Sequence, residues 1–597
     1  MIYRICAFSV ILILNLSAGG QNRVTGISLL NYTGEIRYVP DVMGFVVVAD
    51  NLNLSVDQKQ IQRDEIILFP GWPVSIGGSN ERGGVYANLD GDEDFELIYP
   101  AGTMLYALNI DGTAVEGWPR QLDHPTDGSA AFGDIDGDGA GEIVVTTHEN
   151  ATFAIGSVYA FETDGTMVTG FPVATEGGGI RTPALSDLDL NGALEIVMTV
   201  RKWPDGFVYV FKGDGTMFPG WPQRMDYVPG SAAAAGDIDG DDYPEIIAES
   251  YYRLHAYNRF GDLLPGFPYL PGENRVFSYS TPVLADLDED GNREIICGDH
   301  SIGDGTGAVH IVRYNGLSLP DWPRFTVSWV YSPPSVADID GNGLLDVAVG
   351  DQTLSETPVN RIYAWTAMTG EALPGFPVEN VHGINSQILL ADVDGDGMVE
   401  LITDDNTSNG KYAGFNHDGT VAEGWPLALD GTTFFINPFV TDIDFDGTLD
   451  ISGAGYIVGA GLTNVYLWNT GKDYVEENNP LPILQYNTRR NGVFGDTLMV
   501  GIRDHKEKMT GKWSLSPNPA RHIVSVHFSG NPAKSHPGKT VSIRVFNSSG
   551  EIYLSEYYPE NPPFLINLTG FPPGIYFIKI EDEPTGGETL KMVILPK

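Results

Sequence analysis

Cysteine is almost absent from this chain of 597 residues, which contains only Cys6 and Cys297. Two cysteines this far apart in sequence cannot form the dense disulfide framework that stabilises many small extracellular domains. Cys297 follows directly on an apolar stretch, so we expect it to be a buried structural thiol. Any additional stabilisation of the fold must come from another source.

Basic residues are also scarce. The chain has 34 Lys and Arg against 79 Asp and Glu, for a formal net charge of −45. Binding to nucleic acid or to an anionic membrane surface requires faces rich in Lys and Arg. The composition therefore predicts neither a nucleic-acid partner nor adsorption to such a membrane.

Long apolar runs are missing apart from one near the start. Arg4, the apolar stretch 5–16 and the small residues 17–20 have the order of a secretory signal peptide, which we place at residues 1–20. The apolar stretch is too short to span a bilayer, which takes about 20 residues. We predict a secreted or cell-surface protein without a membrane span.

What the chain has in abundance is one acidic nonapeptide, D/N-x-D-x-D/N-x-x-x-E/D, which occurs eight times between Asn88 and Asp450. Oxygen side chains at positions 1, 3, 5 and 9 suit Ca²⁺, which takes 6–8 oxygen ligands. Position 6 is glycine in six copies and Glu93 or Asp242 in the other two. The 32 predicted ligands, which include 29 carboxylates, are Asn88, Asp90, Asp92, Glu96, Asp134, Asp136, Asp138, Glu142, Asp187, Asp189, Asn191, Glu195, Asp237, Asp239, Asp241, Glu245, Asp286, Asp288, Asp290, Glu294, Asp338, Asp340, Asn342, Asp346, Asp392, Asp394, Asp396, Glu400, Asp442, Asp444, Asp446 and Asp450.

The copies recur every 46 to 54 residues, a period typical of repeat architectures. Each is followed by apolar alternation, in most units an Asp-Gly-Thr-type turn, and a Gly-Trp/Phe-Pro or similar closure, so each unit is expected to hold about four short strands. Such units predict an all-β fold, an eight-bladed β-propeller at residues 21–495, with seven blades and a divergent unit as the alternative. The closing aromatics are expected to lie between blades. Residues 45–48 and 69–73 resemble half a repeat that completes or covers the last blade.

After a linker at 496–511, a different β pattern occupies residues 512–597 and predicts an immunoglobulin-like β-sandwich. Its motifs are Ser516-Pro517-Asn518-Pro519, Val545-Phe546-Asn547, Gly574-Ile575-Tyr576 and the basic ending at Lys591 and Lys597. In these it resembles the C-terminal sorting domain of the type IX secretion system. The resemblance implies export with the secretion machinery as partner, and release or surface attachment.

The acidic repeats themselves resemble the FG-GAP/VCBS family, which includes the propeller of integrin α-subunits. This resemblance covers roughly residues 45–494 and implies a calcium-stabilised propeller used in adhesion or recognition. The Trp/Phe-Pro closure departs from the integrin form.

The segments between each closure and the next acidic loop vary most, so we expect a ligand-binding face there. Its candidate residues are Arg181, Tyr227, Arg275, Tyr279, Trp329, Tyr331, His382 and Phe434. Mixed aromatic and polar side chains suit a glycan or protein ligand. The sequence contains neither a Gly-x-Ser-x-Gly elbow nor a zinc-protease helix, and we predict a non-catalytic module. Two alternatives are a calcium-dependent polysaccharide lyase, similar to rhamnogalacturonan lyases, and a purely architectural repeat protein.

Overall fold

The computed structural model describes residues 66–496 except 150–152, 278, 354–356 and 409, together with the strands and a few adjoining residues of the C-terminal region and four short strands before residue 48. Nearly all of the predicted signal peptide and linker lie outside these residues. The chain divides into two compact units, Met1–Glu65 and Ile66–Lys597. In the first unit, β1 (Val10–Ile11) pairs with β2 (Leu29–Leu30), and β3 (Ile36–Tyr38) pairs with β4 (Phe45–Val47).

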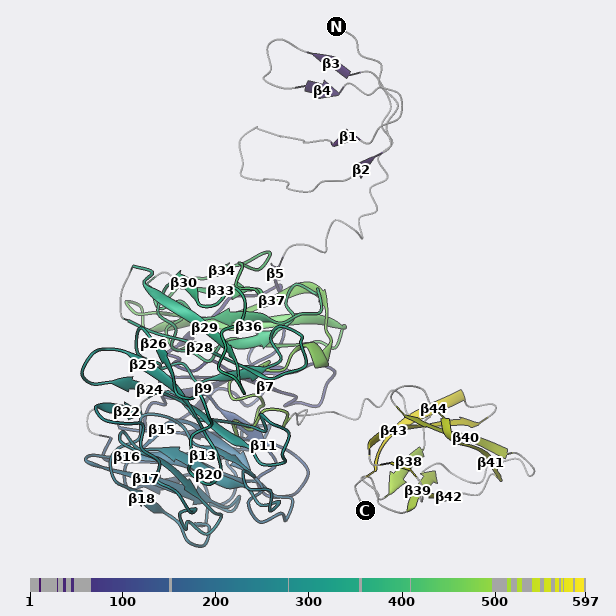
Figure 1. Ribbon diagram of the computed structural model, residues 1–597, viewed down its shortest axis with the longest axis horizontal. Helices are drawn as coiled ribbons and strands as arrows, with labels where there is room; N and C mark the ends of the chain where they lie inside the picture. Colours follow the sequence, from purple (N-terminus) through teal and green to yellow (C-terminus); the bar gives the residue numbers. More distant parts are fainter. Residues whose placement is uncertain are drawn as a thin grey trace. The chain divides into compact units, whose positions relative to one another are not determined.

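Residues 66–496 form small antiparallel sheets, eight within the part described, which follow one another along the chain (Figure 1). The first four sheets consist of β7 (Val85–Ala87), β8 (Glu96–Ala101), β9 (Met104–Leu108) and β10 (Arg120–Gln121); β11 (Ala131–Gly133), β12 (Glu142–Thr146), β13 (Gly156–Phe161) and β14 (Val173–Thr175); β15 (Gly178–Ser186), β16 (Glu195–Lys202), β17 (Asp205–Phe211) and β18 (Gln223–Met225); and β19 (Ala234–Gly236), β20 (Glu245–Glu249) and β21 (Leu254–Tyr257).

The fifth to eighth sheets consist of β22 (Arg275–Phe277), β23 (Val283–Ala285), β24 (Glu294–Ser301), β25 (Gly307–Val312) and β26 (Arg324–Thr326); β27 (Ser335–Ala337), β28 (Asp346–Gly350), β29 (Asn360–Thr366) and β30 (Val378–Val381); β31 (Leu389–Ala391), β32 (Glu400–Thr403), β33 (Lys411–Phe415) and β34 (Leu427–Ala428); and β35 (Phe439–Thr441), β36 (Thr448–Ile457) and β37 (Leu462–Asp473) with β5 (Ile67–Leu68) and β6 (Val74–Gly77). We call the strand before each acidic loop the first strand of its sheet and the strand after it the second. The described residues contain no α-helix and only one 3₁₀ turn, η1 (Glu476–Asn478), and no helix among them is long and apolar enough to cross a membrane. The all-β prediction is confirmed for these residues.

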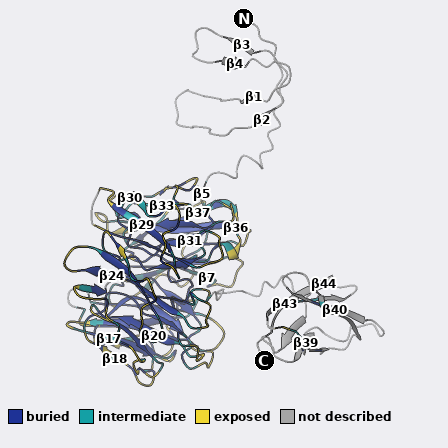
Figure 2. Ribbon diagram, in the orientation of Figure 1, coloured by how far each residue is buried: buried dark blue, intermediate teal, exposed yellow. Residues whose placement is uncertain are grey.

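Local sequence explains the strand pattern. The second and third strands are almost wholly buried in most sheets (Figure 2), in keeping with their continuous Val, Ile and Ala content. Each Asp-Gly-Thr turn is closed by its own side chain, as where the Thr113 N–H donates to Asp111 Oδ1 at 2.9 Å. After each turn the chain runs back antiparallel to the third strand.

The aromatic side chains of the closing motifs link consecutive sheets. The indole N–H of Trp118 donates to the Thr163 carbonyl at 3.1 Å, and that of Trp322 donates to the Ala367 carbonyl at 2.7 Å. Both indoles are buried, and the peptide bond to the following proline is cis in each case. Their spacing along the chain therefore follows from a structural contact repeated between neighbouring sheets.

The eighth sheet joins the two ends of this region. Strands β5 and β6 pair with β37, so residues 67–77 supply the outer part of a sheet whose other strands begin near residue 439. The expectation that an N-terminal segment completes the last unit holds for the part near residues 69–73. Residues 45–47 pair with β3 in the first unit, and their predicted part in the last blade stays a prediction.

Residues 481–494, which we call the crossing segment, contact the first strand of every described sheet or the residue beside it. Backbone N–H groups of Phe132, Leu185, Ala235, Leu284, Leu390 and Val440 donate to carbonyls of the segment at 2.8–3.3 Å. The Val336 N–H donates to the Tyr486 hydroxyl at 2.8 Å, and Arg490 donates to the Gly84 carbonyl, also at 2.8 Å. The first strands therefore converge on one stretch of 14 residues, which the sequence repeat did not predict.

The C-terminal region contains two further antiparallel sheets. One is β38 (Trp513–Ser516), β39 (Ile523–Phe528) and β42 (Phe564–Asn567), and the other is β41 (Ile552–Pro559), β40 (Thr540–Asn547), β43 (Gly574–Asp582) and β44 (Gly586–Ile594). Both sheets contribute buried side chains, among them Val526, Ile566, Ile543 and Ile578. The strands predicted at 523–528, 541–546 and 575–580 coincide with β39, β40 and β43.

Candidate metal loops and ligand-binding face

Each acidic loop connects a first strand to a second strand, and its ninth residue has the same hydrogen bond in all eight copies. This carboxylate accepts the backbone N–H of position 2 at 2.5–3.1 Å, as in the bond from Ile135 to Glu142 at 2.8 Å. The bond fixes one carboxylate oxygen and folds the loop back over the start of the second strand. The other oxygen of position 9 is thereby held near the side chains of positions 1 and 3.

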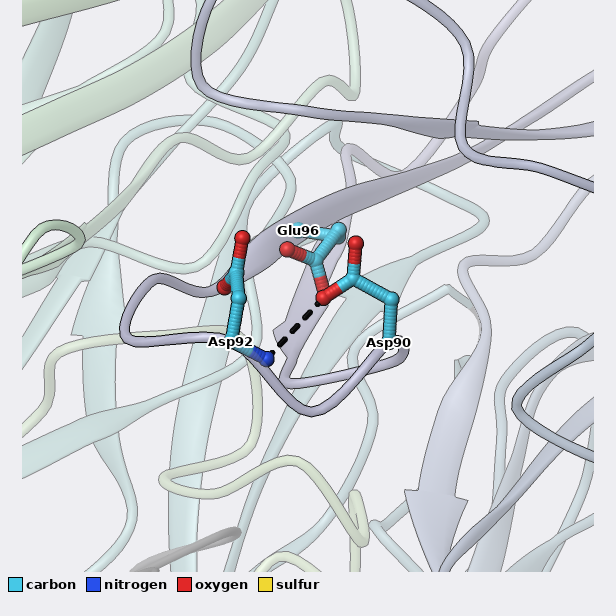
Figure 3. A group of neighbouring side chains, drawn as sticks. All are labelled: Asp90, Asp92 and Glu96. Carbon is cyan, nitrogen blue, oxygen red and sulfur yellow. Dashed lines mark hydrogen bonds between the residues drawn. The ribbon is translucent and has the colours of Figure 1, made fainter.

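The side chains of the loops do come together. In the first loop Asp90, Asp92 and Glu96 face a common space (Figure 3), where the Asp92 N–H donates to Asp90 Oδ1 at 3.1 Å. Their candidate ligand atoms lie within 4.8 Å of one another. The same holds for the following four loops and for three further groups among the described residues: Asp134, Asp136 and Glu142; Asp187, Asp189 and Glu195; Asp237, Asp239 and Glu245; and Asp286, Asp288 and Glu294 are the sets of those four loops.

Several of these oxygens are buried and have no hydrogen-bond partner among the described residues. They include Glu142 Oε1, Asp346 Oδ1, Glu400 Oε1 and Asp450 Oδ1 at position 9, and Asp189, Asp239 and Asp288 Oδ1 at position 3. A buried carboxylate oxygen without a partner is costly. The donor set contains only oxygen, which suits a hard divalent cation such as Ca²⁺. The residues present therefore fit the predicted ion.

Burial also changes the acidity of position 9. Desolvation, with repulsion from the neighbouring aspartates, raises the pKa of this residue to about 7 in Glu195, Glu294 and Asp346, and to about 8 in the other five loops. A nearby cation favours the ionised form and opposes this shift. Each loop thus holds a carboxylate whose ionisation is unfavourable unless positive charge is close to it.

The backbone of the loops explains the glycines. Six position-6 glycines have positive φ, from 86° in Gly447 to 96° in Gly192, and Asp242 adopts the same conformation at 74°. Glu93 is not among the positive-φ residues, so the first loop differs from the rest. Position 4 has positive φ in all eight loops, including Leu190, Glu289 and Phe445 at 52–58°. Residues other than Gly, Asn and Asp rarely adopt this conformation, and the motif did not predict a positive φ at Leu190, Glu289 or Phe445.

The variable segments lie at the other end of each sheet. Because successive strands are antiparallel, the acidic loop is at one end, and the hairpin joining the second and third strands is at the opposite end. The segment that leads into the first strand shares that opposite end, which we call the variable end. Six of its eight hairpins carry an exposed apolar side chain within the described residues: Ile155 (52%), Trp203 (68%), Tyr252 (44%), Ile302 (58%), Val359 (49%) and Val458 (71%).

Four of the eight predicted ligand-face residues form a connected aromatic group with Phe435. The Arg181 guanidinium carbon lies 5.3 Å from the centroid of the Tyr279 ring and 5.6 Å from that of the Phe435 ring. The ring centroids of Tyr279 and Tyr331 are 4.6 Å apart. Phe434 contacts Phe435 at 4.4 Å. These residues precede the first strands of four different sheets or lie at their start. Arg181, Tyr279 and Phe435 have φ of 62–66°, a strained conformation for bulky residues that clusters at functional sites.

Two other predicted residues extend this group. The ring centroids of Trp329 and Tyr331 are 5.6 Å apart. The ring centroid of Tyr227 lies 5.3 Å from that of the exposed Trp203 and 5.0 Å from that of Tyr252. Trp203 and Tyr252 were not predicted, because they lie in hairpins between the second and third strands and the predicted ligand-face residues all precede the acidic loops.

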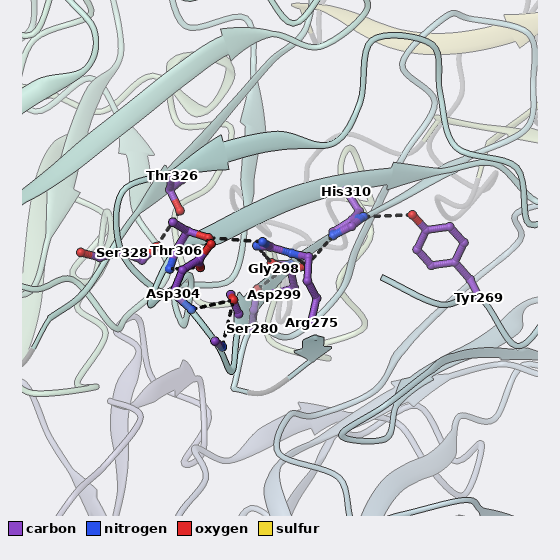
Figure 4. A network of polar contacts seen from close by, with 12 residues as sticks. Tyr269, Arg275, Ser280, Gly298, Asp299, Asp304, Thr306, His310, Thr326 and Ser328 are labelled. Atoms are coloured by element: carbon purple, nitrogen blue, oxygen red, sulfur yellow. Dashed lines mark hydrogen bonds and ion pairs between the residues drawn. The ribbon is translucent and has the colours of Figure 1, made fainter. Parts of the chain in front are cut away.

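Arg275 does not join the aromatic group and belongs to a buried polar network (Figure 4). Its guanidinium binds both oxygens of Asp299, which is fully buried and also accepts from His310 Nε2 at 2.8 Å. Burial alone would raise the pKa of Asp299, but hydrogen bonds from Arg275 and His310 outweigh it and hold that pKa below its usual value. His310 Nδ1 in turn bonds the Tyr269 hydroxyl at 2.9 Å. Arg275 therefore satisfies a buried carboxylate rather than extending the aromatic group.

His382 is separate from the aromatic group as well. Its Nδ1 donates to Asp405 Oδ2 at 2.9 Å, beside a cavity of about 250 Å³ at the seventh sheet. A larger cavity of about 510 Å³ lies between the first and second sheets, lined mainly by small residues together with Glu81 and His148.

Comparison with protein-family models finds two matches, an FG-GAP-like repeat at residues 286–349 and a secretion system C-terminal sorting domain at 514–595. Comparison with curated proteins finds no match. Solved structures similar to the chain include Sqt1 of Saccharomyces cerevisiae (12% identity, TM-score 0.44, 68% of this chain and 99% of that one), the V. cholerae biofilm matrix protein Bap1 (12%, 0.36, 70% and 92%) and BBS1N in complex with ARL6DN (13%, 0.38, 68% and 97%). The chain thus contains an FG-GAP-like repeat at residues 286–349 and a type IX sorting domain at residues 514–595, and the sorting domain indicates export to the cell surface or secretion.

Proposed function

We propose that the protein is a calcium-stabilised, eight-bladed β-propeller that recognises a glycan or protein at its variable end. In this proposal the eight sheets are the blades, the acidic loops hold one Ca²⁺ each, and the C-terminal sheets pack as an immunoglobulin-like sandwich that engages the secretion machinery. The protein acts as a non-catalytic adhesion or recognition module outside the cell.

Two contacts support a closed ring. The pairing of β6 with β37 joins the start of the repeat region to its last sheet, and the first strands all contact the crossing segment. A linear array of sheets would leave its two end sheets far apart, with no common segment reaching all first strands. Eight sheets around one centre meet both conditions.

The observation that carries the recognition function is the exposed apolar surface of the variable end. Trp203 and Val458 are 68% and 71% exposed, and four other hairpin tips are at least 44% exposed. Trp203 and Tyr252 both contact Tyr227, so three aromatic rings form a continuous surface there, and exposed apolar surface of this kind marks interaction sites. Aromatic residues beside them, Tyr227 and Trp203 above all, supply the flat surfaces that suit sugar rings or a protein hot spot.

A binding screen with two variants tests this proposal. The full-length mature chain is applied, in the presence of Ca²⁺, to a glycan array and to a panel of extracellular proteins. Trp203→Ala combined with Tyr252→Ala is expected to weaken binding at least tenfold, because it removes two anchors from the surface. Leu317→Ala, 63% exposed at the end of the acidic loops, is the matched control and should bind normally.

The screen also separates the alternatives. Binding that the double variant leaves unchanged would refute recognition at the variable end, and complete absence of binding would favour the architectural alternative. Incubation with pectic polysaccharides, followed by ultraviolet absorbance of unsaturated products, tests the lyase alternative directly.

A further inference from the structure

The cavity beside His382 combines polar groups of opposite hydrogen-bonding character. Its polar lining includes His382, Asp405 and Lys411, and its apolar lining includes Val381, Ile384 and Ala413. Lys411 and Ala413 belong to β33, Val381 ends β30, and the others come from the segment after β30 or the hairpin after β32. The sequence predicted His382 as a ligand-face residue but gave no reason to connect it with Asp405 and Lys411, more than 20 positions further along.

Asp405 organises the site. Only 4% of the residue is exposed, and its Oδ2 accepts from His382 Nδ1 at 2.9 Å and pairs with Lys411 Nζ at 3.3 Å. Its backbone N–H donates to Thr433 Oγ1 at 3.0 Å, which holds the residue in place. Asp405 Oδ1 has no partner among the described residues, so this one buried oxygen lacks a donor.

The same contacts determine which hydrogen-bond donors and acceptors His382 and Lys411 present to a ligand. A carboxylate oxygen only accepts, so His382 carries its proton on Nδ1, and the Nε2 of the neutral ring is an acceptor. Lys411 Nζ is a charged donor whose side chain is 37% exposed, and its only partner among the described residues is Asp405. The cavity therefore presents one acceptor and one strong donor beside an apolar wall, and Asp405 holds both in place.

The charge and the size of the cavity limit the kinds of ligand that it can bind. Asp405 neutralises Lys411, and the adjacent Asp404 has both oxygens engaged by backbone N–H groups, of Asn385, Ser386 and Phe435. No net positive charge is left to attract a carboxylate or phosphate. At about 250 Å³ the cavity is smaller than the roughly 300–1,000 Å³ of pockets for drug-sized ligands. It matches one neutral ring whose neighbouring hydroxyls can both donate and accept.

We propose that this cavity binds one neutral sugar residue of a glycan ligand. The proposal rests on the recognition function above and assigns its glycan form. Sugar hydroxyls donate to His382 Nε2 and accept from Lys411 Nζ, while Val381 and Ile384 cover the apolar edge of the ring.

The test measures binding of free monosaccharides to the full-length mature chain by saturation-transfer NMR and by competition with the array glycan. The panel pairs neutral sugars with their uronic acids. Lys411→Met and Asp405→Asn are expected to weaken binding of a neutral sugar at least tenfold. Lys202→Met, which removes an exposed lysine paired with Glu176 at the same end, should leave binding unchanged.

The outcomes separate the two proposals. Glycan binding that Lys411→Met and Asp405→Asn leave intact would overturn the sugar site and keep the recognition function. Preference for uronic acids would overturn the neutral assignment. A wild-type chain that binds a protein through Trp203 but no sugar would also overturn it. Because Asp405 is buried, Lys411→Met at the rim decides the matter if Asp405→Asn fails to fold.

Discussion

At the scale of single residues, Arg490 shows how one side chain can serve a whole fold. It is fully buried, and its guanidinium donates to the carbonyls of Gly84, Ala130 and Leu484 and to Ser129 Oγ at 2.7–3.1 Å. Burial lowers its pKa to about 9, still above neutral pH, so the group is charged. Its donors thus satisfy acceptors in the first two sheets and within the crossing segment.

Replacing this residue should be severely destabilising. Arg490→Met keeps much of the volume but leaves four buried acceptors without a donor, at about 1–3 kcal/mol each. We expect the free energy of unfolding to fall by at least about 3 kcal/mol, measured by urea denaturation. Arg224→Met, at an exposed ion pair with Asp205, should cost under about 1 kcal/mol. Equal effects of the two substitutions would contradict the role assigned to Arg490.

At the scale of elements, the acidic loop is the repeated candidate site for a stabilising ion. Each loop places several carboxylates close together, and oxygens of at least four ninth residues are buried without partners. An ion that binds the folded loop and not the unfolded chain adds its binding free energy to stability. Chelation of Ca²⁺ should therefore lower Tm strongly, with recovery on adding Ca²⁺ back. A melting curve indifferent to chelator, with no metal by elemental analysis, would exclude structural calcium.

A single loop can be tested by an isosteric change. Glu142→Gln keeps an oxygen that can accept the Ile135 N–H but removes the charge that the ion requires. We expect bound Ca²⁺ to fall by about one ion per chain in elemental analysis, with a moderate drop in Tm. Glu116→Gln, which lies outside every acidic loop, serves as the control. An unchanged ion count in Glu142→Gln would remove the second loop from the set of calcium sites.

The elements also show what the sequence could predict. The residue types at the positions of Asp134, Gly139 and Glu142 recur at the same spacing in other acidic loops because the loops share one backbone geometry. That geometry depends on the loop's own residues, so the sequence alone could predict it. Trp203 and Tyr252 could not be selected, because their exposure depends on hairpins that carry no motif. The association of His382 with Asp405 and Lys411 could not be predicted either, since it depends on the pairing of β32 with both β31 and β33.

At the scale of the whole molecule, the crossing segment predicts where the chain can be shortened. Residues 481–494 bond to all eight first strands or their neighbours, whereas the described contacts of the sheets end at Asp496. A chain ending at residue 496 should keep the Tm of the repeat region. One ending at residue 479 should lose cooperative unfolding and resistance to proteases, as followed by circular dichroism and limited proteolysis. Equal stability of both truncations would show the segment to be dispensable.

The crossing segment has a consequence for the timing of folding. Gly84 and its partner Arg490 are 406 positions apart, so the contact cannot form until almost the entire repeat region has left the ribosome. Contacts of such long range make folding slow. Until then the first strands lack acceptors for their N–H groups, and no early intermediate can contain the finished centre. The crossing segment is therefore the part of the repeat region that is made last, and its synthesis decides when assembly of the eight sheets can finish.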